Sequence, residues 1–211
     1  MNIRKVMTVG TVLLLSITLG ACGNNSSSRH SSSSSKSEKV PGPLTKVGTY
    51  TKDSKSGKIT LMSIKKYQNK KIKTKGATYY FKDAKLLKIE TTAKDQRADD
   101  ASNFGKSLSD TYYEYQLEYS LKNNSKSTVS SNGAELITPQ GNQVSSNKGS
   151  IDGLVGETIQ SGAKKSAILQ AIAKKDDIKN LSKYKLVSAE LYKNGGNYTV
   201  TDKPTTLNFN K

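Results

Sequence analysis

Serine and lysine are the residue types in this chain that could carry covalent chemistry. The single cysteine, Cys22, and the single histidine, His30, both lie near the N-terminus, so the rest of the chain has neither a thiol nor an imidazole. A serine nucleophile with a lysine base needs neither group, and the usual spacing of this pair is Ser-x-x-Lys. That spacing occurs five times, at Ser33/Lys36, Ser63/Lys66, Ser145/Lys148, Ser161/Lys164 and Ser182/Lys185.

These five pairs do not amount to a catalytic signal. With 28 serines and 31 lysines in 211 residues, chance alone gives about four such pairs. The Lys-Ser/Thr-Gly triplet that accompanies the pair in penicillin-binding enzymes occurs as Lys55-Ser56-Gly57. It precedes four of the five pairs, whereas those enzymes carry it far downstream. We therefore expect a protein that is not an enzyme, with no catalytic residues and no cofactor.

Aspartates are concentrated in the segment 94–110, the longest polar connection between the expected strands. Carboxylate oxygens are ligands that calcium prefers, but the spacing here is not that of an EF-hand loop. We expect a flexible, solvent-exposed loop in this segment and no metal site elsewhere. The loop holds a weak calcium candidate, made of Asp95, Asp99 and Asp100.

The first residues have the order of a secretion signal. A basic head, Arg4 and Lys5, precedes an uncharged apolar run of about 14 residues at 6–19, which is too short to cross a bilayer but suits a signal peptide. The sequence Leu19-Gly20-Ala21-Cys22 resembles the lipobox of bacterial lipoproteins. This resemblance implies that the signal peptide, 1–21, is removed. It also implies that Cys22 carries diacylglyceryl and palmitate groups, which anchor the protein to the extracytoplasmic face of the cell membrane.

The alternative is an ordinary signal peptide with a chance cysteine, and the residues after Cys22 argue against it. Nine of the twelve residues at 26–37 are serine, and such a sequence buries too little apolar surface to fold. We expect 22–43 to be a disordered linker with a span of roughly 26 Å. Pro41-Gly42-Pro43 ends it, and the folded domain is expected at 44–211.

The stretch KKYQNKKIKTK at 65–75 has six lysines and no acidic residue. If the chain turns near Gln68-Asn69, these lysines gather at one end of the domain with the preceding Lys52, Lys55 and Lys58. The alternative is a solubilising surface, as most runs of charge are. The candidate polyanion-binding residues are Lys65, Lys66, Lys70, Lys71, Lys73 and Lys75.

The charge of the whole chain points to anionic partners. The formal charge of +17 falls to +15 once residues 1–21 are removed, because they hold two basic residues and no acid. Arginine, the better residue for recognising bases and phosphates, occurs only three times. Lysine suits diffuse attraction to a polyanion instead of specific nucleic-acid recognition. The expected partners are wall teichoic or lipoteichoic acid, lipid headgroups or extracellular DNA.

The clearest structural element is TYYEYQLEYSLK at 111–122, in which apolar and polar residues alternate. A period of two places alternate side chains on opposite faces of a strand. We therefore expect a strand with Tyr112, Glu114 and the other even-numbered residues facing solvent. The residues expected to face the core are Tyr113, Tyr115, Leu117, Tyr119 and Leu121.

Other segments predict short strands separated by turns. Strands are expected at 57–64, 77–92 and 184–192, with Leu207 and Phe209 facing inward in the last segment. The segment 133–144 reads as strand, turn and strand, and NGGN at 194–197 reads as a hairpin turn. The segment 166–181 has helical spacing, but a strand near 164–172 followed by a turn or short helix is favoured.

Four segments together resemble the immunoglobulin-like domains of Gram-positive surface lipoproteins, which belong to families of unknown function. The segments are YxYxLxYSLKNNS at 113–125, ELITPQG at 135–141, IQSGAKKSAILQAI at 159–172 and YKLVSAELY at 184–192, preceded by a strand that begins with glycine. The resemblance covers about 59–209. It implies an all-β fold, an immunoglobulin-like antiparallel β-sandwich, and it transfers no site residue.

We therefore expect a lipid-anchored binding module at the interface of the membrane and the cell wall. Its partner would be an anionic wall polymer such as teichoic acid or another envelope protein. The alternatives are an accessory or sensor subunit of a membrane complex and, disfavoured by the missing chemistry, an enzyme.

Overall fold

The computed structural model describes residues 38–53, 57–68, 70–91, 93–146, 148–193 and 199–210. The segment Ser35–Lys211 forms one compact unit. The signal peptide, the lipobox with Cys22, the linker up to residue 37 and the NGGN turn lie outside the described residues. In the part of the chain that is described, no helix is long and apolar enough to span a membrane.

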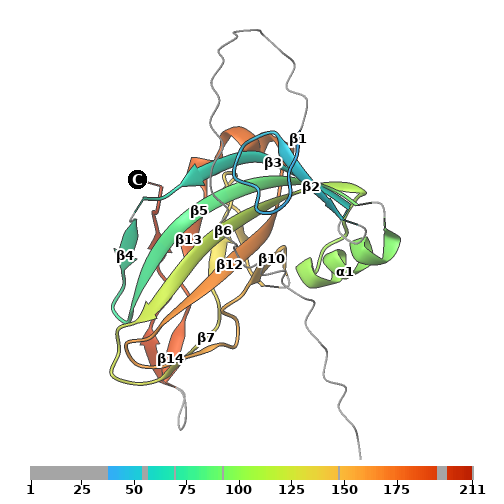
Figure 1. Ribbon diagram of the computed structural model, residues 1–211. Helices are drawn as coiled ribbons and strands as arrows, with labels where there is room; N and C mark the ends of the chain where they lie inside the picture. The colour runs from blue at the N-terminus through green and yellow to red at the C-terminus, as the bar shows by residue number, and fades with distance from the viewer. Residues whose placement is uncertain are drawn as a thin grey trace, which may run out of the picture. The chain divides into compact units, whose positions relative to one another are not determined.

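One large sheet forms the first layer of the compact unit (Figure 1). Its strands pair antiparallel, except that β1 pairs parallel with β2. β1 lies before residue 44, where the sequence predicts the domain to begin. A short strand, β4 (Lys71–Lys73), also pairs with β5. The strand order is β1 (Glu38–Lys39), β2 (Thr49–Asp53), β3 (Gly57–Lys66), β5 (Ala77–Glu90), β6 (Thr111–Asn123), β12 (Lys164–Ala173) and β10 (Ser150–Asp152).

Two small antiparallel sheets form the second layer, behind the large sheet in Figure 1. The main hydrophobic core lies between the layers, with residues from β5, β6 and β12 on one side and from β7, β8, β13 and β14 on the other. The predicted all-β fold with an antiparallel sandwich is confirmed. The small sheets have the orders β11 (Thr158–Ile159), β7 (Val129–Ser131), β14 (Leu191–Lys193), β15 (Val200–Asp202), and β16 (Thr206–Leu207), β13 (Lys185–Val187), β8 (Glu135–Ile137), β9 (Gln143–Val144).

The strand β6 follows the predicted alternation over most of its length. Every second residue from Tyr115 to Leu121 is buried, as expected, whereas Tyr113, also expected in the core, is only half-buried. The prediction is wrong for Tyr112 and Glu114, which are also buried although they point to the opposite face. The reason is a second, smaller core on that face, where Tyr112 packs with residues of β3 and β5 and with Leu44 from the N-terminal segment.

The segment 94–110, predicted to be a flexible loop, contains the helix α1 (Lys94–Phe104). Gly105 ends the helix in the left-handed conformation, and its N–H donates to the carbonyls of Ala101 and Ser102. Phe104 is the one residue of α1 that is buried. The loop prediction failed because a helix with so few apolar residues has almost no periodic pattern.

The later strands follow the predictions, with one exception. β12 is a strand and is followed by short 3-10 helices, η1 (Lys175–Lys179) and η2 (Leu181–Lys183). β8 and β9 form the expected hairpin, and Leu207 and Phe209 are buried. The single strand expected at 184–192 is wrong, because β13 and β14 belong to different sheets and the chain crosses between them at 188–190.

Candidate anion-binding face

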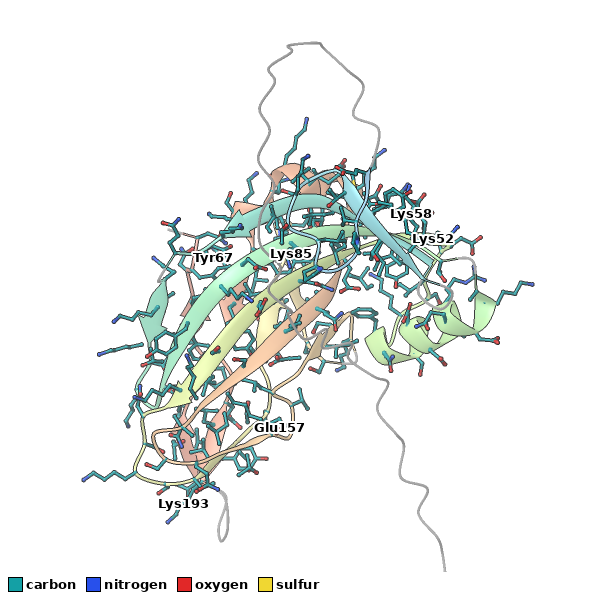
Figure 2. The ribbon with its side chains drawn as sticks, in the orientation of Figure 1. Lys52, Lys58, Tyr67, Lys85, Glu157 and Lys193 are labelled. Atoms are coloured by element: carbon teal, nitrogen blue, oxygen red, sulfur yellow. The ribbon has the colours of Figure 1, made fainter. Side chains whose placement is uncertain are left out.

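The lysine-rich segment 65–75 does not fold back on itself. β3 pairs with residues 83–90 of β5, and β4 then pairs with residues 78–80, so β4 continues in the direction of β3. Lys58 and Lys66 lie near opposite ends of β3, about 26 Å apart at ~3.3 Å per residue. Figure 2 shows Lys52 and Lys58 close together, across the β2–β3 pair. These two lysines therefore do not join the others at one end.

The six candidate lysines also differ in their surroundings. The amino group of Lys65 lies 5.5 Å from the centre of the Tyr67 ring and donates to the carbonyl of Asn210 at 3.4 Å. Lys65 and Lys70 are half-buried, whereas the other four are exposed. Among these four, Lys71 and Lys73 lie on β4. They therefore have fixed positions relative to the large sheet.

Strand pairing brings β4 into line with lysines from distant parts of the chain. In a sheet, residues in register on neighbouring strands point to the same face and lie 4.7–4.9 Å apart. Two adjacent rows run across β4, β5, β6 and β12 on the outer face of the large sheet. One row consists of Lys73, Thr78, Lys122 and Lys164, and the other of Lys71, Tyr80, Ser120 and Ser166.

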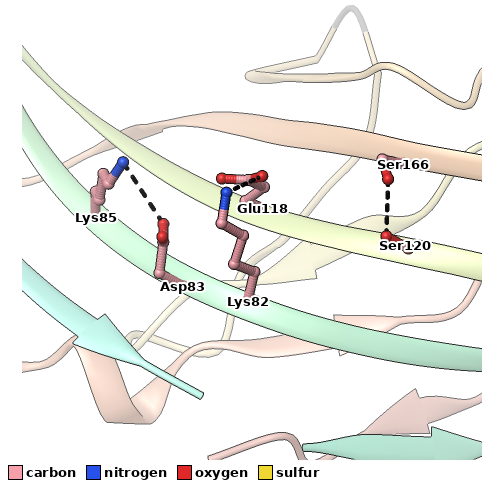
Figure 3. Close-up of polar contacts among 6 residues, drawn as sticks. All are labelled: Lys82, Asp83, Lys85, Glu118, Ser120 and Ser166. Atoms are coloured by element: carbon pink, nitrogen blue, oxygen red, sulfur yellow. Dashed lines mark hydrogen bonds and ion pairs between the residues drawn. The ribbon is translucent and has the colours of Figure 1, made fainter. Parts of the chain in front are cut away.

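We call five residues of these rows the lysine face: Lys71, Lys73, Tyr80, Lys122 and Lys164. The amino group of Lys164 lies 5.2 Å from the centre of the Tyr80 ring, a cation–π arrangement. The hydroxyls of Ser120 and Ser166 are 2.9 Å apart, as Figure 3 shows. Within the described residues, none of the four lysines forms an ion pair.

The next lysines along the same face are neutralised by acidic partners (Figure 3). The amino group of Lys82 donates to Glu118 at 2.7 Å, and that of Lys85 lies 3.7 Å from Asp83. The hydrogen bond that Lys82 donates to Glu118 raises the pKa of Lys82 above its usual value. Among the described residues, positive charge is therefore paired in the middle of the sheet and unpaired at the β4 end, where it attracts anions.

The sequence predicts only two of the four lysines of the lysine face. Lys71 and Lys73 belong to the predicted set, but Lys122 and Lys164 do not. Lys122 ends the polar side of the strand predicted at 111–122, and Lys164 begins the strand predicted near 164–172. Their positions on the outward face can therefore be predicted from the sequence, but their alignment with β4 across the sheet cannot.

Within the residues that the structure describes, the three aspartates of the calcium candidate are not brought together as a metal site. Asp95 and Asp99 are exposed on α1. Asp100 instead accepts hydrogen bonds from the hydroxyl of Tyr112 and the amide of Gln96, both at 2.8 Å. Across the described ranges, no group of three or more His, Cys, Asp or Glu side chains is placed to hold a metal ion.

Comparisons with known proteins leave the function open. No protein-family model matches the chain, and no curated protein matches it. A functionally unknown protein from Listeria monocytogenes EGD-e is similar in structure, with 13% identity and a TM-score of 0.42 over 61% of this chain and 75% of that one. The YjhA protein from Bacillus subtilis is similar with 16% identity and a TM-score of 0.38, over 58% of this chain and 81% of that one.

Proposed function

We propose that the protein is a lipid-anchored, extracytoplasmic module that binds an anionic polymer of the cell envelope, such as teichoic acid, through the lysine face. The observation that carries the proposal is a set of four lysines on adjacent strands that form no ion pair with any residue that the structure describes. The neighbouring Lys82 and Lys85 have acidic partners. A surface that served only solubility would not require lysines with acidic partners and lysines without them to lie in separate regions.

The surface chemistry favours an extended polymer over a compact ligand. The lysine face is part of an open sheet, so a chain with repeated phosphates can contact several lysines at once. Lysine is a flexible point charge that does not fix the geometry of its partner. Tyr80 and the two serine hydroxyls add contacts suited to the carbon and hydroxyl groups between the phosphates. Such binding is strongly weakened by salt.

The resemblance of 19–22 to a lipobox supports a location where such a polymer occurs. Lipidation at Cys22 would hold the protein at the outer surface of the membrane, and the serine-rich linker would let the domain reach roughly 26 Å from its anchor. Two acyl chains anchor a protein stably, whereas one does so only marginally. A Cys22→Ser variant should therefore move from the membrane fraction to the medium or remain unprocessed. An unchanged membrane fraction would contradict the anchor.

The binding test is a titration of the purified full chain with teichoic acid at 50 and 200 mM salt. Four phosphate contacts would weaken binding about 50-fold over this range, if the polymer behaves as a single-stranded nucleic acid does. Replacing the four lysines of the lysine face by glutamine should abolish most of the affinity and of the salt dependence.

The matched control replaces four exposed lysines in η1, η2 and β13 by glutamine. It makes the same change in net charge, but on a different layer of the molecule. Equal loss of binding in both variants would mean that only net charge matters, and no binding at low salt would overturn the proposal. The control lysines are Lys175, Lys179, Lys183 and Lys185.

A further inference from the structure

A groove of about 600 Å³ lies beside the lysine face, between β4 and the C-terminal segment 200–208. Three strands border it, and each is at the edge of its sheet. β4 lies at the margin of the large sheet (Figure 1), while β15 and β16 end the two small sheets. Edge strands turn backbone N–H and C=O groups outward, so a ligand in this groove meets polar backbone as well as side chains.

The pairing of β4 with β5 shows which backbone groups face the groove. The carbonyl of Lys70 accepts from the N–H of Phe81, and the N–H of Thr74 donates to the carbonyl of Ala77, both at 2.9 Å. In an antiparallel pair, alternate residues bond to the partner strand. Lys73 therefore turns its backbone N–H and C=O away from β5 and toward the groove.

The groove is held closed at one end by contacts between β15 and the turn that follows β4. The hydroxyl of Thr74 donates to the carboxylate of Asp202. Gly76 packs so closely that an added Cβ would lie 2.9 Å from the Cβ of Asp202 and 3.2 Å from the carbonyl oxygen of Thr201. These contacts hold β15 against the turn after β4 and so fix one side of the groove.

The groups that line the groove suit a small molecule with a phosphate and several hydroxyls. Lys73, Lys75 and Lys203 bring three positive charges, and Asp202, already bonded to Thr74, brings one negative charge. Thr201 and Thr205 offer hydroxyl oxygens as acceptors, since both hydroxyls already donate to backbone carbonyls. Ile72, Val200 and Leu207 supply apolar contact for carbon atoms. The volume lies within the ~300–1,000 Å³ range of small-molecule sites.

We infer that this groove binds a polyol phosphate or sugar phosphate, as the terminal unit of the anionic polymer that the lysine face holds. The inference rests on the proposed function, since Lys73 belongs both to the lysine face and to the groove. A polymer lying across β6 and β5 reaches the edge at β4, where its end enters the groove. The lysine face supplies avidity along the chain, and the groove recognises the end of the chain.

The test is a titration of the isotope-labelled full chain with glycerol 3-phosphate, followed by backbone amide NMR shifts. Saturable shifts at residues 72–75 and 200–207 are expected. Glycerol, and sodium chloride at the same ionic strength, should not produce them. A Lys75→Gln/Lys203→Gln variant should bind the probe at least about tenfold more weakly, since each charged hydrogen bond lost costs that much or more. A Lys122→Gln/Lys164→Gln variant should bind it as the wild type does.

The two proposals fail in different ways. Teichoic acid could bind the wild type and bind the Lys122→Gln/Lys164→Gln variant more weakly, while glycerol 3-phosphate causes no saturable shift. In that case the groove inference is overturned and the proposed function stands. If glycerol 3-phosphate binds and teichoic acid does not, the proposed function and the link to a polymer end are overturned. Equal amide shifts with sodium chloride would show that the shifts report ionic strength and not binding of the phosphate. That result would also overturn the inference.

Discussion

Lys122 and Lys164 occupy directly opposed positions on the neighbouring antiparallel strands β6 and β12. Side chains so placed have Cβ atoms ~4.5–5.5 Å apart, and like charges there are destabilising. Neither lysine forms an ion pair within the described ranges. The arrangement therefore lowers the stability of the unbound protein, and an anion lying between the two amino groups would remove the repulsion.

Lys122→Gln is expected to stabilise the protein. Removing one of two opposed charges should raise the free energy of unfolding by about 0.2–1 kcal/mol. Lys122 is the better residue to change, because Lys164 also gains from its position over the Tyr80 ring. Urea denaturation at low salt measures the effect, and high salt should reduce it. A loss of stability would contradict the repulsion, and unchanged affinity for teichoic acid would contradict the role of the lysine face.

Tyr79→Phe is expected to destabilise the protein by about 1–3 kcal/mol, the cost of leaving a buried donor without a partner. The hydroxyl oxygen of Tyr79 accepts a hydrogen bond from the N–H of Ala189 at 2.9 Å. This bond links β5 to the segment where the chain crosses from β13 to β14, and Tyr79 is fully buried. Thermal or urea denaturation would measure the loss.

Tyr115→Phe is the matched control for that change. The hydroxyl of Tyr115 is buried, and no hydrogen-bond partner occurs for it in the described part of the chain. Its ring stacks on Tyr184 with 4.0 Å between the ring centres, and phenylalanine keeps that contact. We expect the variant to be as stable as the wild type or more stable by about 1 kcal/mol, since an unsatisfied buried hydroxyl is unfavourable. Equal losses in the two variants would contradict the role given to the Tyr79 bond.

Sequence patterns predicted the long strands well, because each is long enough to show its period. β6 has thirteen residues, and its burial alternates from Tyr115 to Asn123. The pattern of β12 favours a strand over a helix. The failures have local causes. α1 carries a single buried residue, Phe104, and thus has no apolar stripe. The segment 184–192 is buried along most of its length. Its sequence therefore predicts one continuous strand, although its two halves belong to different sheets.

The lysine face shows a different limit of sequence reasoning. A run such as 65–75 is visible in the sequence, but Lys122 and Lys164 join it only through the register of four strands. That register is set by three pairings, of β4 with β5, of β5 with β6 and of β6 with β12. Spacing along the chain carries no information on such pairings, so distant residues of one face cannot be grouped from the sequence alone.

Gly57→Ala is expected to destabilise the protein by more than about 1–3 kcal/mol, the cost of a strained backbone alone. Gly57 begins β3 with a φ of +74°, and an added Cβ would collide with the carbonyl oxygen of Glu90 and lie 2.8 Å from the Cα of Thr91. Gly141→Ala is the control, because its φ is +85° but nothing lies within 4 Å of an added Cβ. Equal losses of unfolding free energy would show that the close approach at Gly57 is unimportant.

Asp152 is a buried carboxylic acid that ties β10 to the small sheets. It accepts hydrogen bonds from the hydroxyl of Tyr119 at 2.9 Å and from the N–H of Ala134 at 2.6 Å. Burial nevertheless raises its pKa from 3.8 to about 6. A raised pKa means that the folded state binds the proton more tightly than the unfolded state. The contribution of Asp152 to stability is therefore greatest below pH 4 and declines as the pH rises to about 6.

Asp152→Asn is expected to remove this pH dependence. A shift of about two pKa units corresponds to about 3 kcal/mol, so the stability of the variant relative to the wild type should rise by up to that amount between pH 4 and pH 7. Urea denaturation at several pH values gives the difference. The buried Glu114, whose pKa is also raised by burial, titrates in both proteins and cancels in the comparison. Parallel stability curves would mean that Asp152 keeps its charge without penalty, and that its hydrogen bonds offset burial in full.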